Sequence, residues 1–506
     1  MKPMVRPCLP LPCAAFVLAF VLAACLAWPA PATAAARQPA AQPETVKTQA
    51  PEDVAELREL PPEVRAALRR AQIPLEALAV VVHDASTGRR VLEEQARTPM
   101  NPASLMKLLT TAAALDRLGP AWTWSTPVWL RGRVVDGVLE GDLHIQGRGD
   151  PGITQERLWL LLRRVQQLGV REIRGDIVID QSAFAMPATD PAAFDGEPLR
   201  PYNVHPAALL INLRSQVYSF VPDPAAGLAR VLTEPPLAGW TADRSVPLVA
   251  TPCGDWRAGL KASFEPARTR FAGTYPTACG ELNWPVADPD PASFDARALR
   301  GLWREMGGSL AGTVREGPAP AGMAPSFEQA SPPLLDTVRN INKFSNNVMA
   351  QQLFLSLALQ AAPKQTATLH AARDTLTQWL QSRVGDAAQD AVVDNGSGLS
   401  RNNRVSARVL AQVLSQAYDS QVMSELMSSL PISGVDGTLR RSRATPGRAH
   451  LKTGSLRDVV GVAGYVLSNS GRRYVLVAIV NHAQAGAARP ALEALVQWTM
   501  RDAPWR

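Results

Sequence analysis

The chain has 506 residues, of which 46% are hydrophobic and 19% are charged, so it can build sizeable buried cores and has room for about three domains. Its formal net charge of +7 is modest for this length, and no dense run of lysine and arginine alternates with aromatic residues. The composition therefore gives no support to nucleic-acid binding.

The N-terminus has the pattern of an export signal. Two basic residues precede the apolar run AAFVLAFVLAACLAW, and small residues in an A-x-A arrangement follow it. The run is too short and wrongly flanked for a permanent membrane span, so we expect cleavage near Ala34 or Ala36. LAAC at 22–25 also resembles a lipoprotein box, which would make Cys25 a lipid anchor. In either case we expect an exported, periplasmic protein.

Residues after the leader are rich in proline and alanine and predict an unstructured linker. Order is expected to begin near residue 57 with a short amphipathic helix, followed by a hairpin that turns at DASTG. Apolar residues at helical spacing predict a helix over 102–118, which Gly119-Pro120 ends.

The pattern then changes to strands over 125–147, with a turn at VVDGVL. A helix at about 154–168 and one strand, EIRGDIVID, follow. Residues 206–287 are mixed, with β-like runs and many prolines. Helices dominate from 333 until HLKTGS, VVGVAGYVL and RRYVLVAIVN, which predict three successive antiparallel strands, and the helix ARPALEALVQWTM closes the chain.

Cys253 and Cys279 are the two cysteines that lie beyond the leader. In an oxidising compartment they most simply form one disulfide, whose closed loop would stabilise the fold by roughly 3 kcal/mol. Neither these cysteines nor the six histidines have metal-ligand spacing. The sequence therefore predicts no metal and no cofactor.

Lysine is rare in this chain: of 52 lysines and arginines only seven are lysine, and one of them, Lys107, follows Ser104 by three residues. On a helix the two side chains would share a face, with Cβ atoms about 5–6 Å apart. A serine hydroxyl is a poor nucleophile without a base, and lysine can be that base when burial or a nearby cation lowers its pKa. Ser104 and Lys107 are therefore a candidate catalytic pair.

Two further motifs follow in chain order. Ser345-Asn346-Asn347 is a Ser-x-Asn on a predicted loop that enters a helix, and Lys452-Thr453-Gly454-Ser455 opens the final sheet. Ser-x-x-Lys, a Ser-x-Asn motif and Lys-Thr-Gly occur together in β-lactamases and penicillin-binding proteins. No G-x-S-x-G elbow competes with them, since DNGSGLS has Asn395 where the first glycine should be.

With these motifs the chain resembles a class C low-molecular-mass penicillin-binding protein of the D-alanyl-D-alanine carboxypeptidase/endopeptidase family. The motifs start at 104, 345 and 452, and the phrases GRGDPGIT, RPYNVHPAAL, DNGSGLSRNNRVS and LPISGVDGTLRRS are also family-like. The resemblance implies an α/β (α+β) fold, in which the antiparallel sheet of a serine β-lactamase/DD-peptidase-like domain is flanked by helices. Two inserted, mainly β domains would fill the first gap.

The resemblance also implies a division of the chain. It would consist of a signal peptide (1–36), a linker (37–56), a DD-peptidase domain split between 57–119 and 326–506, inserted domain II (120–205 and 288–325) and inserted domain III (206–287).

In such an enzyme Ser104 would attack the penultimate D-alanine of a peptidoglycan stem peptide, or a D-amino-acid–diaminopimelate cross-link, with Lys107 as the base. Ser345 and Lys452 would relay the proton to the leaving amine, and Asn347 would bind the substrate's amide. β-Lactams would acylate the same serine as covalent inhibitors.

The implied substrate-binding residues lie in two places. On the final sheet, Thr453, Gly454 and Ser455 would bind the substrate, with the two hydroxyls on the terminal carboxylate and the Ser104 and Ser455 N–H groups as the oxyanion hole. The stem-peptide side chain would contact Arg401, Tyr202 and Glu197 (or Asp195).

Three questions stay open at this point. A catalytically silent wall-binding scaffold and a β-lactamase are the alternative functions, although GELNW lacks the spacing of a motif that would supply a second base. The preference between carboxypeptidase and endopeptidase action is undetermined. Membrane association would be at most peripheral or through a lipid anchor.

Overall fold

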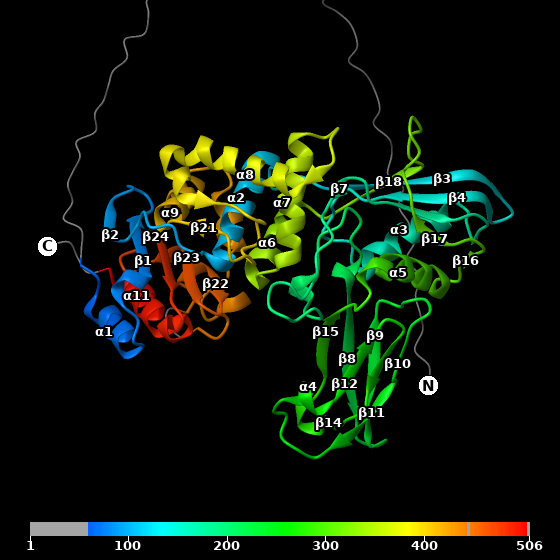
Figure 1. Cartoon of the computed structure of the whole chain (residues 1–506), viewed down its shortest axis with the longest axis horizontal. Coiled ribbons are helices and arrows are strands. Elements are labelled where there is room, and N and C mark those ends of the chain that lie inside the picture. The colour runs from blue at the N-terminus through cyan, green and yellow to red at the C-terminus, as the bar shows by residue number, and fades with distance from the viewer. Residues whose placement is uncertain (1–58, 443–445, 503–506) are drawn as a thin grey trace, which may run out of the picture. The chain divides into compact units, whose positions relative to one another are not determined.

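The computed structural model describes residues 59–442 and 446–502 (Figure 1). The predicted signal peptide, linker and lipid-anchor residue Cys25 lie outside these residues. None of the helices in the described ranges combines the length and the hydropathy needed to cross a membrane.

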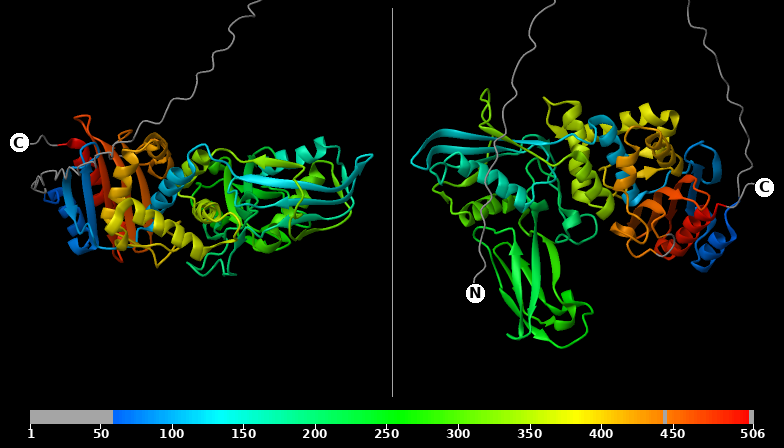
Figure 2. Two further views of the ribbon diagram at one scale, coloured as in Figure 1. Left: turned by 90° about the horizontal axis from the view of Figure 1, so that it is seen from above. Right: turned by 180° about the vertical axis from the view of Figure 1, so that it is seen from behind.

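One antiparallel sheet joins the two ends of the described chain, with five strands in the order β2-β1-β24-β23-β22 (Figures 1 and 2). Its strands are β1 (Leu78–Asp84), β2 (Arg90–Glu94), β22 (Ala449–Leu456), β23 (Val459–Leu467) and β24 (Arg473–Asn481). The β1–β2 hairpin and the three closing strands agree with the sequence prediction. Because β22 ends the strand order, the strand that carries Lys452 is an edge strand.

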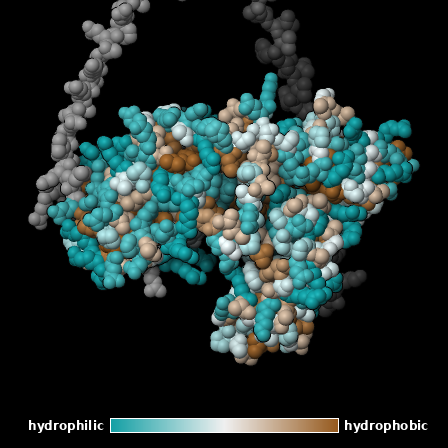
Figure 3. Space-filling model, in the orientation of Figure 1, coloured by the Kyte–Doolittle hydropathy of each residue, from teal (hydrophilic) through white to brown (hydrophobic). Residues whose placement is uncertain are grey.

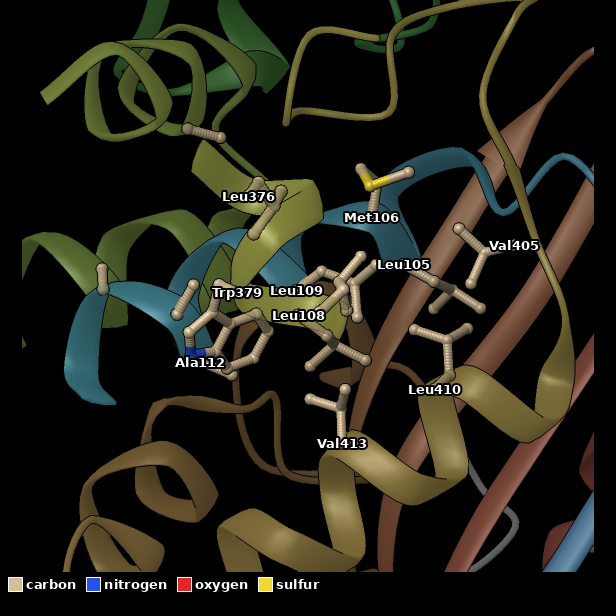
Figure 4. Packing of buried hydrophobic residues seen from close by; sticks show 14 of the residues in the cluster. Leu105, Met106, Leu108, Leu109, Ala112, Leu376, Trp379, Val405, Leu410 and Val413 are labelled. Atoms are coloured by element: carbon tan, nitrogen blue, oxygen red, sulfur yellow. The ribbon is translucent and has the colours of Figure 1, made fainter. Parts of the chain in front are cut away.

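Helices cover both faces of this sheet. One face packs on α1 (Pro62–Arg70) and α11 (Arg489–Arg501). The other face shares one hydrophobic cluster with α2 (Met106–Leu118), α6 (Leu334–Phe344), α7 (Asn347–Ala361), α8 (Leu369–Val384), α9 (Ala407–Tyr418) and α10 (Met423–Ser429). Helix α2 lies inside this second layer, where its Leu108 and Leu109, with Leu105 just before the helix, meet side chains of α8 and α9 (Figure 4).

A seven-stranded sheet follows α2 in the chain. Its strands are β3 (Ser125–Val135), β4 (Val138–Gln146), β5 (Glu172–Ile173), β6 (Ile177–Asp180), β16 (Ser309–Leu310), β17 (Val314–Glu316) and β18 (Phe327–Ala330). Its apolar residues pack with those of α3 (Gln155–Gln167) and α5 (Pro291–Glu305).

The prediction of one continuous strand over EIRGDIVID is wrong, because the segment breaks into β5 and β6 around Gly175. A Cβ at Gly175 would lie 2.7 Å from the backbone oxygen of Gly141 on β4. The next residue, Asp176, binds Asp142 Oδ1 through its N–H at 2.8 Å. This close approach turns the chain between the two short strands.

Residues 215–287 form two further sheets. The first holds β8 (Ser215–Asp223), β9 (Leu228–Glu234), β11 (Ser245–Val249), β14 (Tyr275–Pro276) and β15 (Leu282–Ala287). The second holds β10 (Thr241–Ala242), β12 (Ala262–Glu265) and β13 (Arg268–Phe271), with α4 (Trp256–Gly259) nearby in the chain. Aromatic residues fill their shared core, and a disulfide joins Cys253 to Cys279.

Two short pairs complete the strands, β7 (Phe184–Ala185) with β19 (Ala367–Thr368) and β20 (Ala391–Val392) with β21 (Arg404–Val405). The face drawn in Figure 3 is mostly hydrophilic, with hydrophobic residues in scattered patches, because the large apolar clusters are buried. The domain boundaries implied by the resemblance stay a prediction.

Candidate active site

Ser104 lies in a single 3-10 turn, Ala103–Leu105, that precedes α2. The helix predicted over 102–118 ends at Leu118 as expected, but the α-helix begins at Met106 and not at residue 102. Ala103 has a φ of +46°, and its N–H binds Asn101 Oδ1 at 2.9 Å. A left-handed alanine is strained, and such strain persists where the surrounding structure holds it in place.

Asn101 fixes this turn to two distant segments. Its Nδ2 donates to the Ser400 carbonyl at 2.9 Å, and its N–H donates to Asn481 Oδ1 at 2.8 Å. Gly398 packs so closely that a Cβ there would lie 1.9 Å from the Ala103 carbonyl oxygen. The position of Ser104 thus depends on the end of β24 and on the loop near residue 400.

Lys107 is fully buried and points at Ser104. Its Nζ lies 3.0 Å from Ser104 Oγ, 2.5 Å from Asn347 Oδ1 and 2.6 Å from the Ser397 carbonyl. The structure therefore brings together the Ser-x-x-Lys and Ser-x-Asn motifs, which are 240 residues apart in the chain.

Burial lowers the pKa of Lys107 well below its ordinary value, and the charge of Lys452 lowers it further. Within the described residues Lys107 has oxygen partners but no carboxylate that would favour its charged form. A neutral amine next to a serine hydroxyl can accept that hydroxyl's proton.

The second serine of the site, Ser345, lies between two helices. It ends α6 with a left-handed φ of +58°, and Asn346 caps α7 by accepting a hydrogen bond from the Met349 N–H at 3.0 Å. The loop predicted to enter a helix is confirmed. Lys452 Nζ donates to Ser345 Oγ at 2.9 Å, and burial lowers the pKa of Lys452 to about 7.

Successive residues of β22 face opposite sides of the sheet. Lys452 and Gly454 face the turn of Ser104, since a Cβ at Gly454 would lie 2.7 Å from the Pro102 carbonyl oxygen. On the opposite side Thr453 Oγ1 lies 2.8 Å from Thr438 Oγ1, and Ser455 Oγ accepts a hydrogen bond from Arg489 Nη2 at 3.1 Å.

Comparison with known proteins bears on this arrangement. The model of the D-Ala-D-Ala carboxypeptidase 3 (S13) family matches residues 61–502. The chain belongs to this family. Its members are D-Ala-D-Ala carboxypeptidases, so the chain is an enzyme of this class, and the family resemblance seen in the motifs is confirmed.

Individual relatives agree with the family. The D-alanyl-D-alanine carboxypeptidase of Actinomadura sp. (strain R39) is 27% identical over 465 residues, which cover 87% of this chain and 84% of that protein. The structure of penicillin binding protein 4 (dacB) from Haemophilus influenzae matches with a TM-score of 0.67 at 22% identity, over 86% of this chain and 99% of that chain. A structure of that protein complexed with a novel β-lactam matches with a TM-score of 0.63 at 22% identity, with the same coverage. These likenesses confirm the predicted fold class.

The predicted side-chain subsite of this S13 chain is brought together only in part. Arg401 pairs with Asp458 at 2.7 Å, and its guanidinium carbon lies 5.0 Å from the centre of the Phe194 ring. Asp195, which follows Phe194 in the chain, accepts a hydrogen bond from the Tyr202 hydroxyl at 2.9 Å. Glu197 instead pairs with Arg200 at 3.4 Å, so Asp195 is the acid that contacts the tyrosine.

Several residues of the site went unnoticed in the sequence. Ser397, Thr438 and Arg489 contact motif residues, and Asn101 binds Ala103, the residue before Ser104; each of the four lies on a different segment. Ser397 and Thr438 lie inside the family-like phrases DNGSGLSRNNRVS and LPISGVDGTLRRS, and these phrases were the only feature of the sequence that could have pointed to them. Nothing in the sequence singled out Arg489. Among the described residues no group of three His, Cys, Asp or Glu side chains could hold a metal ion.

Proposed function

We propose that Ser104 is the nucleophile with which this D-Ala-D-Ala carboxypeptidase attacks peptidoglycan stem peptides and, as a DD-endopeptidase, their cross-links. One observation carries the proposal: a fully buried lysine, with no carboxylate partner among the described residues, lies 3.0 Å from Ser104 Oγ. An enclosed amine of this kind is tuned to be neutral, which is what a general base needs.

Acylation begins when Lys107 takes the hydroxyl proton and Ser104 Oγ attacks the carbonyl of the penultimate D-alanine. Negative charge on the carbonyl oxygen is stabilised by the N–H groups of Ser104 and Ser455. Losing one such donor typically costs about 10²–10³ in rate. Asn347 uses its oxygen on Lys107, so its NH₂ group is the end that binds the substrate's amide carbonyl.

The leaving amine needs a proton as the bond to carbon breaks. Lys452 donates to Ser345 Oγ, and the serine hydroxyl passes a proton to the amine. Water then attacks the ester on Ser104, releases the shortened peptide and restores the enzyme. Thr453 and Ser455 hold the terminal carboxylate during the first step.

The test is labelling of the purified protein, without its leader, by a fluorescent penicillin, followed by peptide mass mapping. We expect a stable adduct on the peptide that contains Ser104, absent in Ser104→Ala and present in the control Ser86→Ala, an exposed serine of the β1–β2 turn. Folded protein that forms no adduct would contradict the proposal and favour a wall-binding scaffold.

The penicillin adduct also tests the β-lactamase alternative. Covalent inhibition by β-lactams requires slow hydrolysis of the acyl-enzyme, so turnover of penicillin faster than about one per second, a typical enzymatic rate, would favour a β-lactamase. Membership of the carboxypeptidase family supports slow turnover, as does the crystal structure of the Haemophilus influenzae relative with a bound β-lactam.

We also propose that the protein is exported to the periplasm and associates with membrane at most peripherally or through lipidated Cys25. The leader pattern supports export, as does the Cys253–Cys279 disulfide, since such bonds persist in oxidising compartments. The mass of the N-terminal peptide of the mature protein distinguishes cleavage near Ala34 or Ala36 from lipidation at Cys25. An intact leader on the mature protein would contradict export by this route.

A further inference from the structure

The side chain of Asn395 closes the loop DNGSGLS at 394–400. Its Oδ1 accepts hydrogen bonds from the Ser397 N–H at 3.1 Å, from the Ser397 hydroxyl at 3.0 Å and from the Gly398 N–H at 3.3 Å. Its Nδ2 donates to the Leu399 carbonyl at 2.8 Å. An asparagine that binds backbone groups just ahead of it in this way forms an Asx-turn. One side chain therefore sets the course of the backbone through the next residues.

This course brings the carbonyl of Ser397 to Lys107. The carbonyl oxygen lies 2.6 Å from Lys107 Nζ, and both residues are fully buried. The neighbouring carbonyl, that of Gly396, accepts a hydrogen bond from the Thr110 hydroxyl at 2.6 Å. Thr110 lies three residues after Lys107 on α2, so the two carbonyls bind one face of that helix.

The number of protons on Lys107 gives the Ser397 carbonyl a role. A charged lysine has three N–H donors, so the neutral amine has two N–H groups and one lone pair. The oxygens of Asn347, at 2.5 Å, and Ser397, at 2.6 Å, only accept, so each takes one N–H. The lone pair is left for the third partner, the Ser104 hydroxyl at 3.0 Å. The O–H bond of this hydroxyl then breaks as the third N–H bond of the amine forms.

We propose that Asn395 is a positioning residue, which holds the Ser397 carbonyl on Lys107 and so directs the lone pair of the amine at Ser104. This inference rests on the proposed function. Without the carbonyl one N–H of the neutral amine would lack an acceptor, and a buried donor turns to whatever acceptor remains. The remaining oxygen partner of Nζ is Ser104 Oγ. An amine that donates to this oxygen does not present its lone pair to the hydroxyl proton.

The test is the rate of penicillin acylation of Ser104, measured by stopped-flow labelling over a range of penicillin concentrations. This range separates the Kd of non-covalent binding from the rate constant of acylation. In Asn395→Ala we expect the rate constant to fall at least about tenfold, because a misplacement of about 1 Å typically costs about 10²-fold. The Kd should change less than about threefold, since the substitution acts through the base.

Two further variants show which property of Asn395 matters. Asn402→Ala is the matched control, because Asn402 is exposed and alanine keeps its N–H, which binds Ser400 Oγ at 2.9 Å. It should acylate at the wild-type rate. Asn395→Ser keeps a short, weaker acceptor in the turn and should acylate at least about threefold faster than Asn395→Ala. Thermal unfolding of each variant checks that it is folded.

Wild-type acylation by Asn395→Ala would overturn the inference. Equal losses in binding and in acylation would also overturn it, because the loop would then support the whole site and not the base in particular. If Asn395→Ser is as slow as Asn395→Ala, the acceptor is not what positions Lys107. Failure of the proposed function looks different, since the wild-type protein itself would then form no adduct on Ser104.

Discussion

Two fully buried lysines, Lys107 and Lys452, form the chemical centre of this site. Among the described residues both are bound by neutral oxygens and by no carboxylate, so their charged forms are disfavoured. Burial lowers both pKa values, and the Lys452 charge lowers that of Lys107 further. A charged Lys452 therefore favours the neutral form of Lys107, which is the form that a general base needs.

A neutral Lys107 that works beside a charged Lys452 predicts a bell-shaped pH profile for kcat/KM on a peptide substrate. The alkaline limb should lie near pH 7, where Lys452 loses the proton that it relays, and protonation of Lys107 should set the acid limb. In Lys452→Met the acid limb of penicillin acylation should move to higher pH, because the neighbouring charge is gone. An acid limb unmoved by that substitution would contradict the coupling.

The same substitution predicts a gain in stability. The pKa of Lys452 falls from 10.5 unfolded to about 7 folded, so the unfolded chain binds the proton more readily and the fold loses free energy as pH drops from 10.5 to 7. After allowance for two lost hydrogen bonds, Lys452→Met should raise the free energy of unfolding at pH 6 by roughly 2–3 kcal/mol. Urea denaturation measures this, and the difference should shrink above pH 10. If the variant is no more stable than the wild-type protein at pH 6, the charged Lys452 does not destabilise the fold as proposed.

At the scale of elements, the turn before α2 is shaped by the loop that packs on it. Gly398 has a φ of +82°, and a Cβ there would lie 1.9 Å from the Ala103 carbonyl oxygen, so Gly398→Ala must displace the turn of Ser104. A displacement of about 1 Å typically costs about 10²-fold in rate. We expect penicillin acylation of this variant to slow by that factor, measured by stopped-flow labelling.

Gly471→Ala is the matched control for this substitution. Gly471 has a similar φ of +86°, but a Cβ there would have open space around it, with no described residue other than its chain neighbours within 4 Å. It should lose about 1 kcal/mol of stability from backbone strain and acylate at the wild-type rate. Equal slowing in both variants would assign the effect to backbone strain alone.

The sequence predicts the elements of this fold better than their contacts. Periodicity located the closing strands and the end of α2, and motif spacing selected Ser104, Lys107, Ser345 and Lys452. Periodicity did not predict the 3-10 turn, because the hydrogen bond between Asn101 and Asn481 joins residues 380 positions apart. Arg489 is likewise recognisable only once α11 lies beside β22.

At the scale of the molecule, the proposed catalytic residues and the disulfide lie beside different sheets with separate hydrophobic clusters. Ser104 lies beside the sheet that contains β22 to β24, whereas Cys253 and Cys279 flank the aromatic core of residues 215–287. Substitutions in one cluster should therefore have little effect on the chemistry of the other, since distant sites without shared partners act independently.

The double variant Cys253→Ser/Cys279→Ser tests this independence. Opening a loop with a sequence separation of 26 residues should destabilise the aromatic core by roughly 3 kcal/mol. We expect faster proteolysis within 215–287, measured by mass spectrometry, with penicillin acylation of Ser104 at the wild-type rate. Slowed acylation in protein whose sheets remain folded would show that the two clusters are coupled, and would give the disulfide-linked segment a part in the reaction.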